Sequence, residues 1–216
     1  AIEQDLVDVI LVAYNFGQDP DFLNRLKQSL HFSDLQPGLP RMLAKAKEKN
    51  IGIVAMKTLM GARRNDIRPY EKEGSTFSQT AFRWILANPY VDGLIVSMTS
   101  KEQINEYVGG SGGMDLSDAE FGLLRRYLVS YGRKYCRHGC DLCLGACPQG
   151  VEISEVLRTR MYDVDYKNRE LAKADYKVIG GGADACLNCS DQPCKNACPL
   201  GIPISEWTTD TARRLA

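Results

Sequence analysis

Eight cysteines, the full complement of the chain, lie in two short runs, and none occurs before residue 136. The members of the first run are Cys136, Cys140, Cys143 and Cys147, and those of the second are Cys186, Cys189, Cys194 and Cys198. Closely spaced thiols can ligate a soft metal, pair as disulfides or pack as small apolar groups. Whatever chemistry they perform is therefore confined to the C-terminal region.

The spacing within both runs is close to the bacterial ferredoxin pattern, C-x2-C-x2-C-x3-C-P. The first run is C-x3-C-x2-C-x3-C-P and the second is C-x2-C-x4-C-x3-C-P, so each has one widened gap. Short gaps let a loop fold round a four-iron cluster, and the proline turns the chain away after the fourth thiolate. We predict two [4Fe–4S] clusters, with all eight cysteines as metal ligands.

The same pattern predicts how the two runs share their ligands. In two-cluster ferredoxins the fourth cysteine of each run ligates the other cluster. By analogy, we expect Cys198 to join the first three cysteines of the first run. Cys147 is then expected to join the first three cysteines of the second run.

Three alternatives to this ligand set remain open. Two four-thiolate zinc sites would also use every cysteine, although zinc does not explain the paired Cys-Pro endings. Four disulfides could join the eight cysteines in 105 ways, although grouping them beside a cysteine-free region is unlike a disulfide-stapled secreted domain. His138, inside the first run, could ligate iron, but the cysteine count is already complete.

A weak internal repeat accompanies the cysteines. The stretch ACPQGVEISEV (146–156) matches ACPLGIPISEW (197–207). Each copy is expected to turn at its glycine and to offer a serine, Ser154 or Ser205, as the cap of a following helix. Two copies of one unit imply two copies of one site.

The N-terminal region has the alternating pattern of an α/β fold. Residues 7–15, 51–57 and 93–98 are almost continuously apolar, which predicts parallel strands covered on both faces. Helices are expected over 40–49, 77–88 and 101–108, the last capped by Ser100. This order of strands and helices is typical of a parallel sheet.

The composition of the chain limits the partners it can have, and a glycine-rich stretch indicates where its domains divide. The formal net charge is zero, and no apolar run approaches the ~20 residues of a membrane helix, so we expect neither nucleic-acid binding nor a membrane span. GGSGG at 109–113 predicts a flexible linker, followed by a helix whose capping box begins at Ser117. We therefore expect a first domain over 1–108, a linker over 109–115 and a helical domain over 116–216.

The first region resembles the last part of an aldo/keto reductase barrel. The resemblance rests on DVILVAYN, IGIVAMKTLMG and QTAFRWILANPYVDGLIVSMTSKEQINEYV, which are similar to the sixth to eighth strands of that family and their helices. With its cysteine runs, the chain resembles the ferredoxin-tailed branch of these oxidoreductases. The implied fold is the last three β/α units of a TIM-type (β/α)8 barrel, followed by a small, mostly helical ferredoxin-like iron–sulfur domain.

The resemblance also implies NAD or NADP at the carboxyl ends of the barrel strands. The phosphate site of a barrel commonly lies in the loops after its last strands, which here indicates Ser97, Met98 and Ser100. Lys57, after the second strand, would face the same opening, although a solvated loop lysine is the alternative.

Two further positions bear on the nicotinamide cofactor. Gln103 stands where many family members have an arginine for the adenosine 2′-phosphate, so a preference for NADP is in doubt. Glu106 matches an acidic position that the family uses near the adenine. We predict both as cofactor-binding residues.

The catalytic residues of the family come from the first half of the barrel, which has no counterpart here, so none is assigned. We expect this sequence to be the C-terminal portion of a longer oxidoreductase that transfers hydride to or from a small carbonyl compound. The alternative is a non-catalytic electron-transfer subunit that docks a redox partner protein through a partial barrel. A cytoplasmic location is expected, and export of a folded precursor stays open because the chain begins AIEQ without a methionine.

Overall fold

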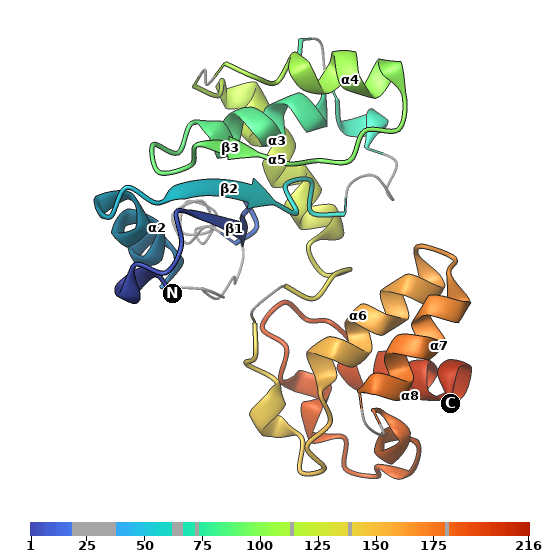
Figure 1. Cartoon of the computed structure of the whole chain (residues 1–216). Coiled ribbons are helices and arrows are strands. Elements are labelled where there is room, and N and C mark those ends of the chain that lie inside the picture. The colour runs from blue at the N-terminus through green and yellow to red at the C-terminus, as the bar shows by residue number, and fades with distance from the viewer. Residues whose placement is uncertain (19–37, 62–66, 72–73, 113–114, 138–139, 180–181) are drawn as a thin grey trace. The chain divides into compact units, whose positions relative to one another are not determined.

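The computed structural model describes residues 1–18, 38–61, 67–71, 74–112, 115–137, 140–179 and 182–216 (Figure 1). These residues form two compact units, Ala1–Gly132 and Arg133–Ala216. The division falls after the helix that the sequence analysis placed in the second domain. The reason is that this helix, α5 (Asp118–Tyr131), packs against α3 (Phe77–Leu86) of the first unit.

The first unit is built on a parallel sheet of three strands in the order β1 (Val9–Ala13), β2 (Gly52–Met56) and β3 (Gly93–Leu94). The three strands and their parallel direction are as predicted, but each is shorter than its apolar run. β3 ends early because pairing with β2 stops once the Ile95 amide has donated to the Ala55 carbonyl, 2.9 Å away.

One face of this sheet is covered by helices. Because side chains alternate along a strand, Ile53 and Ala55 share a face, and both are fully buried against α2 (Leu39–Glu48) and α3. Leu43 of α2 and Ile85 of α3 pack in the same cluster. This is the layering that a parallel sheet requires on one side.

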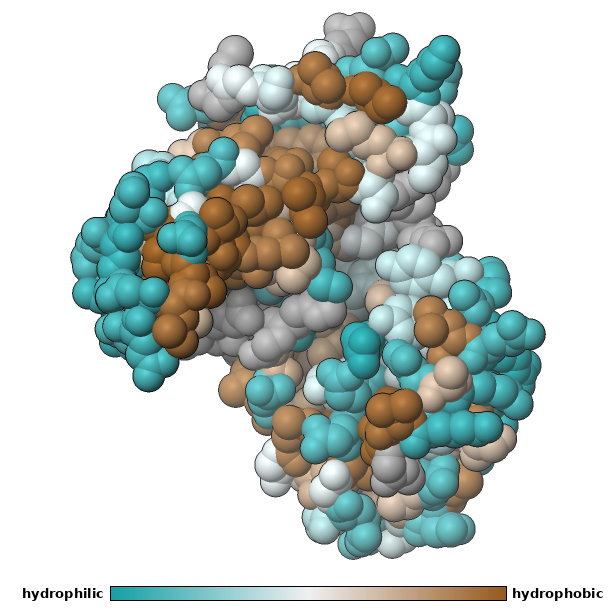
Figure 2. Space-filling model, in the orientation of Figure 1, coloured by the Kyte–Doolittle hydropathy of each residue, from teal (hydrophilic) through white to brown (hydrophobic). Residues whose placement is uncertain are grey.

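The opposite face differs from the expectation that both faces would be covered. Leu11 lies beside Val54 and Gly93 on this face, and Ile95 follows two residues after Gly93. Leu11 and Ile95 are each 51% exposed and Val9 is 59% exposed. Apolar side chains accordingly gather over this part of the first unit (Figure 2).

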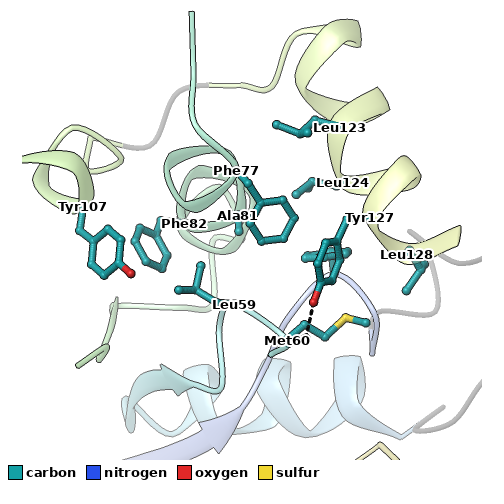
Figure 3. Packing of buried hydrophobic residues seen from close by; sticks show 11 residues of the cluster. Leu59, Met60, Phe77, Ala81, Phe82, Tyr107, Leu123, Leu124, Tyr127 and Leu128 are labelled. Atoms are coloured by element: carbon teal, nitrogen blue, oxygen red, sulfur yellow. Dashed lines mark hydrogen bonds between the residues drawn. The ribbon is translucent and has the colours of Figure 1, made fainter. Parts of the chain in front are cut away.

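A second apolar cluster joins α3 to α5 (Figure 3). The rings of Phe77 and Tyr127 have their centroids 4.5 Å apart, and the Tyr127 hydroxyl donates a buried hydrogen bond of 2.8 Å to the Met60 carbonyl. Both helices begin with a capping box, at Thr76 and at the predicted Ser117. The helix α4 (Lys101–Val108) follows β3 and begins at the predicted cap, Ser100.

The α-helices in the described part of the second unit are α6 (Ile153–Val164), α7 (Arg169–Val178) and α8 (Ile204–Leu215). α6 packs against both of the others, and Asp163, only 6% exposed, accepts a hydrogen bond of 2.6 Å from Arg214 of α8. Short 3-10 helices accompany the cysteines: η4 (Leu144–Ala146) lies between Cys143 and Cys147, η5 (Asp184–Asn188) contains Cys186, and η6 (Pro193–Asn196) contains Cys194.

In the described part of the chain, no helix has both the length and the apolar character that crossing a bilayer requires.

Candidate metal centre

The internal repeat of the sequence is also a repeat of backbone structure. After the last cysteine of each run the chain turns at a glycine with positive φ, 64° at Gly150 and 70° at Gly201. The Gly150 amide donates to the Cys147 carbonyl (3.2 Å), and the Gly201 amide donates to the Cys198 carbonyl (3.0 Å). The two glycines are needed there because a left-handed backbone strains any residue with a Cβ. Each run is therefore closed by the same turn.

The helices that follow these turns begin differently from the prediction. α6 begins at Ile153 and α8 at Ile204, so Ser154 and Ser205 lie inside their helices and neither is the cap. The flanking positions, Glu152 and Pro203, make no side-chain capping hydrogen bond. Burial positions both helices instead, since Ile153 and Ile204 are each 1% exposed.

Three thiols of the first run lie in one electrostatic environment with a thiol of the second. Burial raises the pKa of Cys136 to about 12, and Cys140, Cys143 and Cys198 add to the effect. Burial also raises the pKa of Cys143 to about 11, again with contributions from Cys140 and Cys198. We call these four residues, Cys136, Cys140, Cys143 and Cys198, the first quartet.

The other four cysteines line a single cavity. Its wall includes Cys147, Cys186, Cys189 and Cys194, which we call the second quartet. Burial raises the pKa of Cys194, and the thiols of the other three members raise it further. Ser205, Thr208 and Thr209 from the start of α8 complete one side of the cavity.

The fourth cysteine of each run therefore lies near the first three cysteines of the other run. That each such group shares a cluster stays a prediction. The two quartets are also neighbours, because Cys194 contributes to the raised pKa of Cys143. All eight cysteines are free thiols. His138 lies outside the described residues.

Four thiols gathered at one site can bind only a few kinds of metal centre. Sets of four sulfur ligands bind zinc or iron–sulfur clusters, because soft thiolates favour these metals. Among the described residues, no three or more His, Cys, Asp or Glu side chains are arranged to hold a single ion. The second quartet instead surrounds a hollow. Thiols with raised pKa values are protonated at neutral pH, so any metal that binds them must displace protons.

Lys57, the first of the predicted nicotinamide residues, follows β2 at the carboxyl edge of the sheet. Its φ is 58°, a left-handed backbone that is uncommon for a residue with a side chain. A buried amide network holds this conformation: Asn15 Nδ2 donates to the Lys57 carbonyl (3.1 Å) and to Gln18 Oε1 (2.8 Å). The sequence analysis gave no role to Asn15 or Gln18. Their position directly after β1 was the available signal.

The remaining predicted cofactor residues lie after β3, at the same edge. Ser97 and Met98 are exposed in the loop, and Ser100 accepts a hydrogen bond from the Gln103 amide (3.2 Å). The Gln103 side chain accepts from the amide and the hydroxyl of Thr99, at 2.8 and 3.0 Å. It therefore closes the loop that precedes α4.

Glu106 faces the first unit's own helices. Its carboxylate accepts a hydrogen bond of 2.7 Å from Thr76, the residue that caps α3. The side chains of Gln103 and Glu106 are thus both engaged within the protein.

Comparison of the chain with family models, with curated proteins and with solved structures finds no match.

Proposed function

We propose that the second unit binds two [4Fe–4S] clusters, one on each quartet. The observation that carries this proposal is that the fourth cysteine of each run lies near the first three cysteines of the other run. A pair of separate four-thiolate sites, each built from one run, would need no such arrangement. Two-cluster ferredoxins use it, because the two halves of their repeat are folded round each other.

The residues present fit this group. The second quartet supplies four thiols around one cavity, and the other polar residues of its wall are uncharged: the hydroxyl residues of α8 and the glutamines Gln149 and Gln192. A hollow between the thiols suits a cluster whose irons occupy several corners better than a single ion at one point. When bound, such clusters supply one-electron capacity.

We further propose that the whole protein is an aldo/keto reductase-like oxidoreductase, acting on a small carbonyl compound with NAD or NADP. Two features of the first unit support this. Lys57 and the loop before α4 follow parallel strands of one sheet, so they lie at the same carboxyl edge. The exposed apolar face at Leu11 and Ile95 is the face that the interior of a closed barrel would bury. The proposed setting is the cytoplasm, where thiols stay reduced.

A second candidate is a non-catalytic electron-transfer subunit that docks a redox protein through the first unit. It is favoured by two internal hydrogen bonds: the Gln103 side chain accepts one from Thr99, and the Glu106 side chain accepts one from Thr76. A dinucleotide would have to compete with those internal partners.

Metal analysis of the anaerobically prepared chain tests the cluster proposal. We expect about eight iron atoms and eight inorganic sulfides per chain. The sample should be brown, and its broad visible absorbance should bleach on reduction. A colourless sample with stoichiometric zinc would contradict the proposal.

An activity assay separates the two functions. We expect residues 1–216 alone not to reduce aldehydes or ketones with a nicotinamide cofactor, even with both clusters loaded. A longer polypeptide that carries the five preceding strands should do so if the enzyme proposal holds. An inactive longer protein with both clusters loaded would favour the electron-transfer subunit.

A further inference from the structure

The first quartet has a buried cation beside it. Arg137 directly follows Cys136 and is 5% exposed, and its Nη1 donates a hydrogen bond of 2.9 Å to the Tyr135 carbonyl. This hydrogen bond to the residue before Cys136 folds the guanidinium back along the backbone of that cysteine, a member of the first quartet. The sequence analysis missed this residue, although an arginine directly after the first cysteine was a visible signal.

A second, exposed arginine lies near the same quartet. Arg133 lies over the turn at Gly201, because a Cβ built on that glycine would be 3.7 Å from the Arg133 Nε. The hydrogen bond that closes this turn is accepted by the carbonyl of Cys198, the fourth member of the quartet. Unlike Arg137, Arg133 is exposed to solvent.

The second quartet has different surroundings in the described part of the unit. The position after its first cysteine, equivalent to Arg137, is Leu187, which is 42% exposed. The nearby Asp184 is an exposed carboxylate that accepts a hydrogen bond of 2.7 Å from the Tyr176 hydroxyl. Asp184 lies two residues before Cys186 in the same 3-10 helix, η5. Exposed charges of both signs also lie in the two runs, since Asp141 follows Cys140 and Lys195 follows Cys194, whereas Arg137 is a charge buried beside the first quartet.

We propose that Arg137 makes the cluster on the first quartet the easier of the two to reduce, so that a single electron entering the protein rests there. This inference rests on the proposed clusters. Reduction brings one electron from an external one-electron donor into the cluster, and no bond or proton in the protein changes. The added negative charge is stabilised by a nearby cation, which raises the reduction potential.

Magnitudes favour the buried arginine over the exposed groups. Solvent and salt screen exposed charges, whereas they screen a buried charge much less. Arg137 should therefore have a larger effect than Arg133 or Asp184. Burial of the first quartet acts in the opposite direction, because it disfavours added negative charge. Arg137 offsets that cost.

The test is a potentiometric titration of the anaerobically prepared full chain, followed by visible absorbance and by electron paramagnetic resonance. Wild type should take up two electrons in two resolved steps. Arg137→Gln should lower the potential of the upper step by at least 59 mV, a tenfold change in electron partition for a one-electron couple. Arg137→Lys should restore most of the shift, and Arg133→Gln, the exposed control, should shift it less.

A complementary variant tests the other cluster independently of how well Arg137→Gln folds. Leu187→Arg places a cation after Cys186 and should raise the lower step while leaving the upper one in place. An iron-loaded Arg137→Gln protein with unchanged potentials, or with both steps shifted equally, would overturn the inference. If Arg137→Gln loses its iron, the Leu187→Arg protein decides instead: an unchanged potential of its lower step would also overturn the inference. A wild-type chain that binds no iron would instead overturn the proposed function itself.

Discussion

Cys147 lines the same cavity as Cys186, although it ends the first cysteine run and Cys186 begins the second. The two are brought together because α6, which follows Cys147, packs against α8, which follows the second run. Cys147 therefore belongs to a quartet whose other members come from the second run. This relationship means that each proposed cluster takes ligands from both runs, which gives a direct genetic test of those ligands.

Double variants should reveal which cysteines share a cluster. Cys147→Ser alone should leave about four iron atoms per chain. Adding Cys186→Ser should cost no further iron, because both residues belong to the second quartet. Adding Cys136→Ser instead should remove nearly all iron, since the first quartet is then also broken. Iron and sulfide analysis of the purified anaerobic variants measures this.

The same double variants give a different iron content if the two runs do not exchange their fourth cysteine. If each run holds its own cluster, Cys147→Ser with Cys136→Ser would retain about four iron atoms. Cys147→Ser with Cys186→Ser would then lose nearly all of them. The mirror pair, Cys198→Ser with Cys136→Ser or with Cys186→Ser, serves as the control.

Removing iron should loosen the cysteine-rich segment over 136–207 more than the first unit. The short helices η4 and η5, which carry or adjoin the cysteines, contain no buried residue. Without metal the four thiols of each quartet lose what joins them, so order there should depend on metal. The first unit keeps its two apolar clusters without iron. Limited proteolysis of iron-loaded and chelator-treated protein, with cut sites read by mass spectrometry, measures this. Equal resistance of 136–207 in both samples would argue against metal-dependent folding.

The Tyr127 hydroxyl should contribute measurably to the stability of the first unit. Tyr127→Phe keeps the contact with Phe77 but leaves the Met60 carbonyl without its buried donor. We expect a loss of about 1–2 kcal/mol in the free energy of unfolding. Urea unfolding followed by the fluorescence of Trp84 in a Trp207→Phe background reports on this unit alone. Tyr90→Phe, the same change at a partly exposed tyrosine, should cost less.

The carboxylate of Asp92 should stabilise the first unit in a pH-dependent way. A hydrogen bond from Lys47 (2.6 Å) and one from the Ile53 amide (2.8 Å) hold its pKa below the ordinary value of 3.8. A depressed folded pKa gives stability that is present above pH 3.8 and is lost as the pH falls through the folded value. Asp92→Asn should therefore be less stable than wild type at pH 7.

The difference between Asp92→Asn and wild type should shrink as the pH falls below about 4, and it should disappear below the folded pKa, where Asp92 is neutral in both states. Urea unfolding monitored by Trp84 across this range measures it. The Lys47–Asp92 pair is nearly half exposed, so added salt should reduce the difference at pH 7. A difference that is constant from pH 7 to pH 3 would exclude the carboxylate as its source.

Local features of this protein could be read from the sequence because neighbouring residues decide them. The three strands, the capping box at Ser117 and the cap at Ser100 all depend on periodicity and on side chains within a few residues. The spacing of the cysteines and their Cys-Pro endings likewise predicted which thiols would be grouped. Where local signals were ambiguous, as with Ser154 and Ser205, burial of the adjacent Ile153 and Ile204 determined the start of the helix instead.

Only the tertiary structure decided the features that depend on residues distant in the chain. α5 joins the first unit because Leu124 and Tyr127 find an apolar surface on α3, which no linker composition could reveal. Glu106 of α4 accepts a hydrogen bond from Thr76, the cap of α3, because these two helices meet there. Arg137 becomes a buried charge because its surroundings exclude water from it. How deeply a residue is buried, and which partners it meets, depends on every element that packs around it. A sequence pattern reflects only the influence of residues close by in the chain.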